Sequence, residues 1–496
     1  MKNYKYIALF LLSASIISCD VDNELAEITD SSPIVTLETN GLDFSKYISV
    51  GASFTAGYTD GTVFKAGQQN SFPNILAKQF GVSESFTQPL ANDNFGGLAV
   101  GGNRISSPRF VFGGAGPVPL ESVIGPVTVS TDIILNNPTG PFSNLGVPGA
   151  KSFHLIAPGY GNIANFPSAA NPYAIRMTSS SPDKSILELA VEQNPTFFTL
   201  SEIGGNDVLG YATSGGDGSN GITDTATFDF ALTALVNGLT ANGAKGAIGN
   251  LPDITSLSFF TTVAYNAVPL DAGTAAQLNA GYAAYNGGIQ QAFGLLVQLQ
   301  VMSQADASAE IAKRTISFSE GQNPVVIFDE YLTNLGAINP AFAALPQLRQ
   351  ATADDLVLLT AASLLPTGAG TATPLSDTYV LTPQEQKAIA TATAAYNASI
   401  SAIASEKGLA LVDLNSVLTM ASTTGIEFDG FNLNTALVTG GLISLDGVHP
   451  TSRGYALMAN SFLEAIDRTY GSNFSTATNG LAIARDYPVL FSPTLQ

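Results

Sequence analysis

Tryptophan is absent from this chain of 496 residues, which also has only one cysteine and two histidines. A single cysteine excludes any disulfide within the chain, so the fold must be stabilised by its core alone. So few histidines and cysteines also exclude the usual zinc sites, leaving oxygen atoms as the main metal ligands. We therefore expect neither a metal nor another cofactor.

Basic residues are scarce as well. Lysine and arginine number 19 against 39 aspartates and glutamates, which gives a net charge of −20. Charge of this sign repels nucleic acid, so we expect no nucleic-acid partner. Apolar residues nevertheless make up 45% of the chain, enough for a globular core.

The N-terminus has the pattern of a signal peptide. Lys2 and Lys5 precede an apolar run from Ile7 to Ile17, which is too short to cross a bilayer. No later segment has the continuous apolar length of a membrane span.

The run ends in Ile16-Ile17-Ser18-Cys19, which resembles the lipobox of bacterial lipoproteins. The resemblance implies that residues 1–18 are removed and that Cys19 is lipidated, so that it anchors an outer membrane lipoprotein on the periplasmic face or the cell surface. The alternative is a plain secretory signal followed by a chance cysteine. Residues 19–43 are acidic and weakly apolar, which predicts a flexible tether.

Short apolar runs alternate with helical patterns farther along, which predicts an α/β fold. Strands are predicted at Tyr47–Val50, Thr196–Leu200, Ala244–Ile248, Pro324–Phe328 and Leu409–Asp413. Helices are predicted near Ser185–Gln193, Phe228–Ala241, Thr274–Arg314, Ala351–Leu365, Pro383–Lys407 and Ser452–Tyr470. No regular structure is predicted between Phe54 and Asn144, which is rich in glycine, asparagine and proline.

Four short blocks carry the residues suited to chemistry. In chain order they are Gly51-Ala52-Ser53, Asn144-Leu-Gly-Val-Pro-Gly149, Gly204-Gly205-Asn206-Asp207 and Asp446-Gly-Val-His449-Pro450. The first places a serine just after a predicted strand. The last places an aspartate three residues before a histidine. A hydroxyl, an imidazole and a carboxylate are the parts of a nucleophilic hydrolase.

The order of these blocks resembles the SGNH/GDSL hydrolase family of lipolytic esterases, and most closely its long lipoprotein members from Bacteroidetes-type bacteria. The resemblance implies a flavodoxin-like three-layer α/β/α sandwich with a parallel sheet. It implies one hydrolase domain over residues 44–475, with insertions at about 58–140 and 210–440, and a C-terminal extension over residues 476–496. A monomer is expected.

The same resemblance assigns roles to individual residues. It implies that Ser53 is the nucleophile, His449 the general base and acid, and Asp446 the group that orients the imidazole. The oxyanion hole would consist of the backbone N–H groups of Ser53 and Gly149 and the side-chain amide of Asn206. One position departs from the family pattern, which has aspartate where this chain has Ala52. Because that aspartate supports the turn and is not part of the triad, the departure puts the geometry of the turn in question.

Three of the four blocks also have a plainer interpretation. Gly204-Gly205-Asn206-Asp207 is a common loop sequence, and Asp446-Gly-Val-His449-Pro450 could be a chance turn. Ser53 alone could be a helix cap, and His154 is interpreted as a structural histidine. Asp217 and Asp224 could bind calcium, but a solvated loop is the simpler interpretation.

Taken together, the blocks predict a serine ester hydrolase acting on a small-molecule, glycan or lipid ester. The sequence does not choose between a carboxylesterase or lipase and a glycan O-deacetylase. The alternative is a non-catalytic surface lipoprotein that binds glycans or nutrients on a hydrolase scaffold.

Overall fold

The computed structural model describes residues 34–178 and 180–495. The predicted signal peptide, Cys19 and most of the predicted tether lie outside the described residues. Residues from Leu37 onward form one unit. Its first residues are fastened to the segment that follows the last helix, because the Glu38 backbone N–H donates to Asn473 Oδ1 at 2.7 Å.

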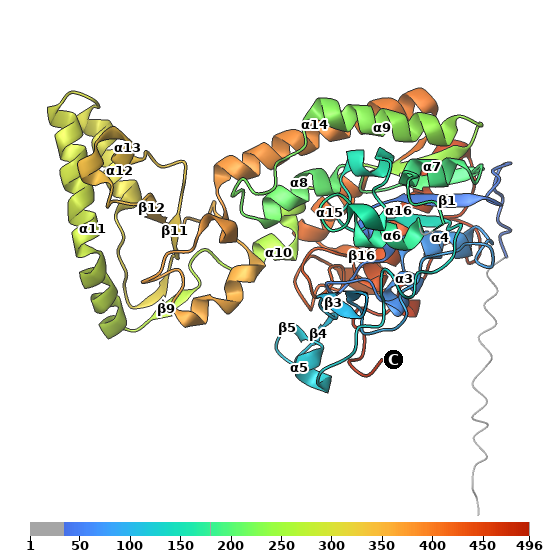
Figure 1. The fold of residues 1–496 in the computed structure, drawn as a ribbon, viewed down its shortest axis with the longest axis horizontal. Helices are drawn as coiled ribbons and strands as arrows, with labels where there is room; N and C mark the ends of the chain where they lie inside the picture. The colour runs from blue at the N-terminus through green and yellow to red at the C-terminus, as the bar shows by residue number, and fades with distance from the viewer. Residues whose placement is uncertain (1–33, 179, 496) are drawn as a thin grey trace, which may run out of the picture. The chain divides into compact units, whose positions relative to one another are not determined.

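A five-stranded parallel sheet is the centre of this unit, as an α/β fold requires (Figure 1). Numbered along the chain, its strands lie in the order 2-1-3-4-5, a common order among doubly wound sheets. In spatial order they are β15 (Ala410–Val412), β8 (Lys245–Gly249), β7 (Phe197–Leu200), β1 (Tyr47–Gly51) and β6 (Asn144–Gly146). Four of them confirm predicted strands. β6 is the strand that the sequence did not indicate.

Helices cover both faces of the sheet, which is why β1 and β7 are buried along their whole length. Three helices pack together on one face: α7 (Ile186–Val191), α9 (Thr225–Thr240) and α14 (Pro383–Lys407). Two others, α4 (Phe72–Gln79) and α16 (Ser452–Tyr470), pack together on the other face. Figure 1 shows α7 and α9 on one side of β1 and α4 on the other.

Local sequence explains where the long helices begin and which face they bury. α14 begins at a capping box in which Thr382 and Glu385 exchange hydrogen bonds, with Pro383 in the first turn. In α16 the apolar residues that recur at helical spacing are buried. Among them, Tyr455 and Phe462 are fully inaccessible to solvent.

The segment between β8 and α14 leaves the sheet and builds cores of its own. It contains helices α10 (Ser258–Thr261), α11 (Ala272–Gln298), α12 (Gln304–Arg314) and α13 (Leu335–Ile338). Three antiparallel ribbons accompany them: β9 (Val268–Leu270) with β10 (Gly321–Asn323), β11 (Val326–Phe328) with β12 (Leu348–Gln350), and β13 (Leu356–Val357) with β14 (Val380–Leu381). The helix predicted over residues 274–314 is confirmed, with a break between α11 and α12.

The helix predicted over Ala351–Leu365 is wrong. That stretch forms β13 and a short 3₁₀ helix, Leu359–Ser363. Asp355 accepts hydrogen bonds from both terminal nitrogens of Arg349 and from the Thr352 backbone, which fixes a turn. Such side-chain bonds compete with helical ones, and the pairing of Val357 with Val380 completes an extended segment.

The prediction of no regular structure after Phe54 is also wrong. This region contains α2 (Ser53–Ala56), α3 (Lys65–Gln69), α4 and α5 (Glu121–Ile124), with two hairpins, β2 (Leu98–Val100) with β3 (Asn103–Ser106) and β4 (Phe110–Phe112) with β5 (Pro117–Pro119). The fully buried Arg109 links it to the end of the chain, because its guanidinium donates to the backbone oxygens of Asn94 and Ser492.

The remaining elements are short. They are α6 (Pro172–Met177), α8 (Gly205–Thr213), α15 (Leu414–Thr423), β16 (Ile426–Phe428) and β17 (Phe431–Leu433). Among the described residues, no helix combines the length and the hydropathy that crossing a membrane requires.

Candidate functional site

Ser53 is the first residue of α2 and follows β1 after a single intervening residue. The turn is too crowded for a larger residue at Gly51, where a Cβ would lie 2.1 Å from Thr55 Oγ1 and 2.4 Å from Glu202 Oε1. At the other end of α2, Gly57 has a φ of 75°, which glycine adopts without strain. Close packing therefore requires glycine at position 51, and the backbone conformation favours glycine at position 57.

A carboxylate reaches the turn from Glu202, two residues after the end of β7. Glu202 Oε1 accepts hydrogen bonds from the backbone N–H groups of Ala52 and Thr55, at 2.7 and 3.1 Å, and from the Thr55 hydroxyl at 2.6 Å. Burial raises the pKa of this carboxyl group, while these bonds and the charge of His449 oppose the rise. Glu202 therefore supports the turn that carries Ser53.

Asp446 and His449 form a tight pair on the loop before α16. His449 Nδ1 lies 2.9 Å from Asp446 Oδ2. Asp446 Oδ1 accepts the backbone N–H groups of Val448 and His449, and Oδ2 also accepts that of Gly61. Burial alone would raise the pKa of Asp446, but the charge of His449 and these hydrogen bonds hold the pKa below its ordinary value. The carboxylate thus stays ionised and fixes the imidazole.

Aromatic contacts bring this pair to the serine turn. The ring of Phe54, the residue after Ser53, lies 5.6 Å from the His449 ring, centroid to centroid, and the ring of Tyr58 lies 4.4 Å from it. Among the described residues no hydrogen bond joins the Ser53 hydroxyl to His449. Such bonds are often long in enzymes without substrate and shorten when substrate binds.

The three predicted oxyanion donors lie after three adjacent strands, at the same edge of the sheet. Ser53 follows β1, Gly149 follows β6 and Asn206 follows β7. Within the described part of the chain, neither the Ser53 nor the Gly149 backbone N–H donates a hydrogen bond. The Asn206 amide donates one hydrogen to the Ala150 carbonyl, at 3.0 Å, which leaves its second hydrogen to donate.

Asp207 links the loop that carries Gly149 to the helix that carries Asn206. It is buried, and its two carboxylate oxygens accept the backbone N–H and the hydroxyl of Ser152, each at 2.8 Å. On the other side of Gly149, the Asn171 amide donates to the Pro148 carbonyl at 2.8 Å. The Gly149 loop is therefore bonded both to the helix that carries Asn206 and to α6.

An apolar cavity opens at the same edge. It comprises about 930 Å³ of empty space, including its mouth, and Ser53, Glu202 and Asn206 are the only polar side chains among its lining residues in the part of the chain described. Helices α8, α15 and α16 form about half of the remaining wall, and the rest comes mainly from the segments that follow β8 and precede α16. An apolar cavity beside a candidate nucleophile, with a few polar groups at one place in its wall, has the character of a ligand site.

The other histidine, His154, has a local structural role, as predicted. Its Nδ1 lies 3.1 Å from the Lys151 backbone nitrogen, which donates to it, and its ring stacks on Tyr160 at 4.6 Å.

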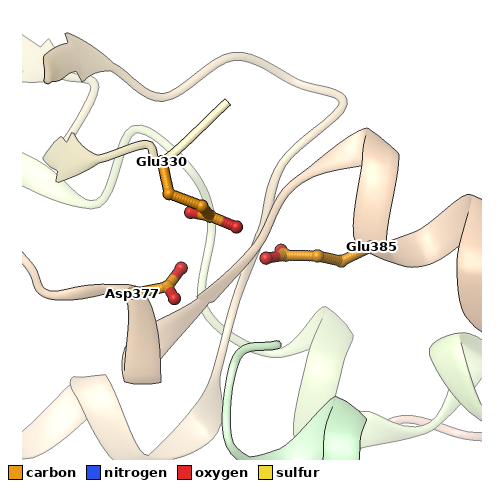
Figure 2. A group of neighbouring side chains, drawn as sticks. All are labelled: Glu330, Asp377 and Glu385. Atoms are coloured by element: carbon orange, nitrogen blue, oxygen red, sulfur yellow. The ribbon is translucent and has the colours of Figure 1, made fainter. Parts of the chain in front are cut away.

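Three carboxylates outside this site could hold a cation. Figure 2 shows Glu330, Asp377 and Glu385 pointing toward one another from three segments, and one oxygen of each lies within 4.8 Å of the others. Glu330 Oε2, Asp377 Oδ1 and Glu385 Oε1 are buried without hydrogen-bond partners. Burial, followed by the charge and proximity of Glu330, raises the pKa of Asp377 to about 7. Burial, followed by the proximity of Glu330, raises the pKa of Glu385 to about 9. The group therefore holds protons at neutral pH.

This group should make stability fall as the pH rises. Unfolded carboxyl groups have pKa values near 4, so between about pH 4 and pH 9 the folded state binds more protons than the unfolded state. We expect Glu385→Gln to flatten this slope, because the amide removes a titrating group and still accepts hydrogen bonds from Thr382. Its Tm should exceed that of the wild type by roughly 1–3 °C near pH 8.5.

Thermal unfolding across this pH range measures the effect. Glu84→Gln, on an exposed loop, is the matched control and should parallel the wild type. Equal slopes for Glu385→Gln and wild type would contradict the assignment. A rise in Tm on adding calcium that Glu385→Gln removes would mark the group as a cation site instead.

Two site residues were missed from the sequence, Glu202 and Asp207. Asp207 lies inside a block that had been identified, and Glu202 lies two residues after the predicted strand, which ends at Leu200. Glu202 follows the carboxyl end of the buried strand β7 and Asp207 lies in the first turn of the helix after it, where open α/β folds place their sites. That position was the available signal.

Comparison with known proteins gives no relative. No family model matches the chain, and no curated protein or solved structure matches it. Support for a function therefore comes from the residues and their geometry.

Proposed function

We propose that this protein is a serine ester hydrolase of SGNH/GDSL type that acts through an acyl-enzyme on Ser53. The observation that carries the proposal is the meeting of the Asp446–His449 pair with Ser53 and unengaged N–H donors at one edge of the sheet. In sheets with this strand order, ligands bind where the order reverses, between the first and third strands along the chain. Ser53 and Asn206 follow those two strands.

In the first half of the reaction, the Ser53 hydroxyl attacks the ester carbonyl carbon. Its proton passes to Nε2 of His449, whose Nδ1–H is held by Asp446. The negative charge that develops on the carbonyl oxygen is stabilised by the N–H groups of Ser53 and Gly149 and by the Asn206 amide. The C–O bond to the alcohol then breaks, and the alcohol leaves with the proton from His449.

In the second half, water hydrolyses the acyl-enzyme. His449 takes a proton from the water, whose oxygen attacks the acyl carbon, and the same donors stabilise the charge. The bond to Ser53 Oγ breaks, Oγ recovers its proton from His449, and the carboxylic acid is released. No step requires a metal or another cofactor.

The proposal includes a place in the cell and a fold family. The SGNH three-layer sandwich is supported by the strand order and by the helices on both faces of the sheet. Anchoring to the outer membrane through a lipidated Cys19 rests on the sequence of the N-terminus alone. A monomer acting on esters, without a nucleic-acid partner, completes the proposal.

Labelling by a fluorophosphonate probe separates this function from that of a non-catalytic binding protein. The probe reacts only with an activated serine, so the wild-type protein should be labelled stoichiometrically. Ser53→Ala should not be labelled, whereas the exposed Ser422→Ala should be labelled fully. Absence of labelling in a folded wild-type protein would favour the binding-protein alternative.

A further inference from the structure

The carboxylate cluster of Glu330, Asp377 and Glu385 is assembled from separate segments. Glu330 lies two residues after β11, and Asp377 begins the 3₁₀ helix Asp377–Tyr379. Both belong to the segment between β8 and α14, which has cores of its own. Glu385 lies in the first turn of α14, a helix that packs against β8 and β15 of the central sheet. Figure 2 shows the three side chains converging on one place.

Glu385 carries an oxygen that lacks a partner. Its side chain is fully buried, and Oε2 accepts the backbone N–H and the hydroxyl of Thr382 at 2.7 and 2.9 Å. Oε1 has no hydrogen-bond partner, and neither has Oε2 of Glu330 nor Oδ1 of Asp377. A buried polar atom without a partner costs stability, so native proteins generally supply one.

No basic side chain supplies that partner in the part of the chain described. None of the three carboxylates forms an ion pair with lysine or arginine there. The guanidinium of Arg349 is engaged by Asp329 and Asp355, at 2.5 and 2.6 Å. The cluster therefore offers negative charge and unoccupied oxygens at one buried place.

We propose that the carboxylate cluster binds one calcium ion, a function separate from ester hydrolysis. Calcium bonds to oxygen at about 2.3–2.6 Å, so two oxygens on one ion can lie up to about 5 Å apart. One oxygen of each carboxylate lies within 4.8 Å of the others, which a single calcium ion can span. Magnesium bonds at about 2.0–2.1 Å and could span only about 4.2 Å. Water would complete the six to eight ligands that calcium takes.

Bound calcium would join the segment between β8 and α14 to the helix that packs on the sheet. The unfolded chain does not hold the three carboxylates together, so calcium binds the folded state and stabilises it. Without calcium the cluster holds protons, and the pH dependence of stability described above belongs to that state.

Calcium titration of the full folded protein, freed of metal with a chelator, tests the proposal. Calorimetry should show one calcium ion per chain, with a Kd near about 10⁻⁴ M because only three carboxylates contribute. At about a hundredfold excess over this Kd, Tm should rise by at least about 2 °C. Magnesium should bind at least about tenfold more weakly. No binding heat and no rise in Tm would overturn the proposal, as would equal affinities for the two ions.

Two variants place the ion. Glu330→Gln and Asp377→Asn each remove one charged ligand and keep the shape of the side chain, so each should weaken calcium binding at least about tenfold. Either variant makes the test if the other does not fold. Asp224→Asn is the control from the acidic loop before α9, because asparagine can still cap that helix. Its calcium affinity should equal that of the wild type, and loss in this variant alone would move the ion to that loop.

Terbium luminescence locates the ion independently. The chain has no tryptophan, so excitation at the tyrosine band reaches bound terbium only through tyrosine. Burial, and after it the charges of Glu385, Glu330 and Asp377, raise the pKa of Tyr331, so its ring lies beside the cluster. Tyr331→Phe should lose much of the sensitised emission and keep the wild-type calcium affinity. Emission that calcium does not displace, or that persists unchanged in Glu330→Gln, would place the lanthanide elsewhere and overturn the assignment.

Discussion

Ser53→Ala and His449→Ala are each expected to reduce kcat on p-nitrophenyl octanoate by roughly 10⁴–10⁶-fold. The first removes the atom that would bond to the acyl group, and the second removes the imidazole that would accept its proton. Because the two residues act in one step, the double variant should be little slower than either single variant. Steady-state kinetics, with circular dichroism to establish folding, measure these losses.

The second histidine supplies the control for this prediction. In the wild type, the Lys151 backbone N–H donates to His154 Nδ1. His154→Asn keeps an acceptor for this N–H and should retain activity within about threefold. A folded His449→Ala protein that keeps more than about a hundredth of the wild-type kcat would show that another group accepts the proton.

Much of the sheet could be predicted because its strands are buried on both faces. Such strands appear in the sequence as short, largely apolar runs, as β7 does. β8 was predicted because Ala244–Ile248 follows a helical pattern. β6 consists of Asn144, Leu145 and Gly146, and no periodicity can be recognised in three such residues. Its position depends on pairing with β1, which is tertiary information.

Part of the candidate site could likewise be predicted from the sequence, and part of it could not. The Asp446–His449 pair lies within four consecutive residues, so its geometry is largely local and could be predicted. The role of Glu202 depends on hydrogen bonds to Ala52 and Thr55, about 150 residues earlier in the chain. No pattern within one segment indicates such a contact. The sequence therefore showed the departure at Ala52 but not the carboxylate of Glu202 that supports the same turn.

The apolar cavity beside Ser53 could not be predicted for a related reason. About half of its apolar lining comes from α8, α15 and α16, each of which also buries residues in the core. A leucine that lines a cavity and a leucine that fills a core have the same place in a helical pattern. Only the packing of the three helices leaves the space unfilled.

Glu202→Ala is expected to lower kcat by about 10²-fold, the second largest effect, although Glu202 carries no assigned step in the reaction. The change removes the acceptor for the Ala52 N–H, the Thr55 N–H and the Thr55 hydroxyl, so the turn can relax and Ser53 can move. A misplacement of about 1 Å at a reacting atom can cost this much. KM should change little, because the substitution leaves the apolar residues that line the cavity beside Ser53 in place.

Two variants separate the support of the turn from the charge of Glu202, which also acts on His449. Glu202→Gln removes the charge but keeps an oxygen that accepts the same hydrogen bonds, so kcat should stay within about tenfold of the wild type. Adding Ala52→Asp to Glu202→Ala places a carboxylate where the SGNH pattern has one, and should recover part of the lost rate. If Glu202→Gln is as slow as Glu202→Ala, and its pH–rate profile is displaced, the carboxylate acts through its charge on the imidazole. In that case Glu202 would not take the place of a carboxylate at position 52.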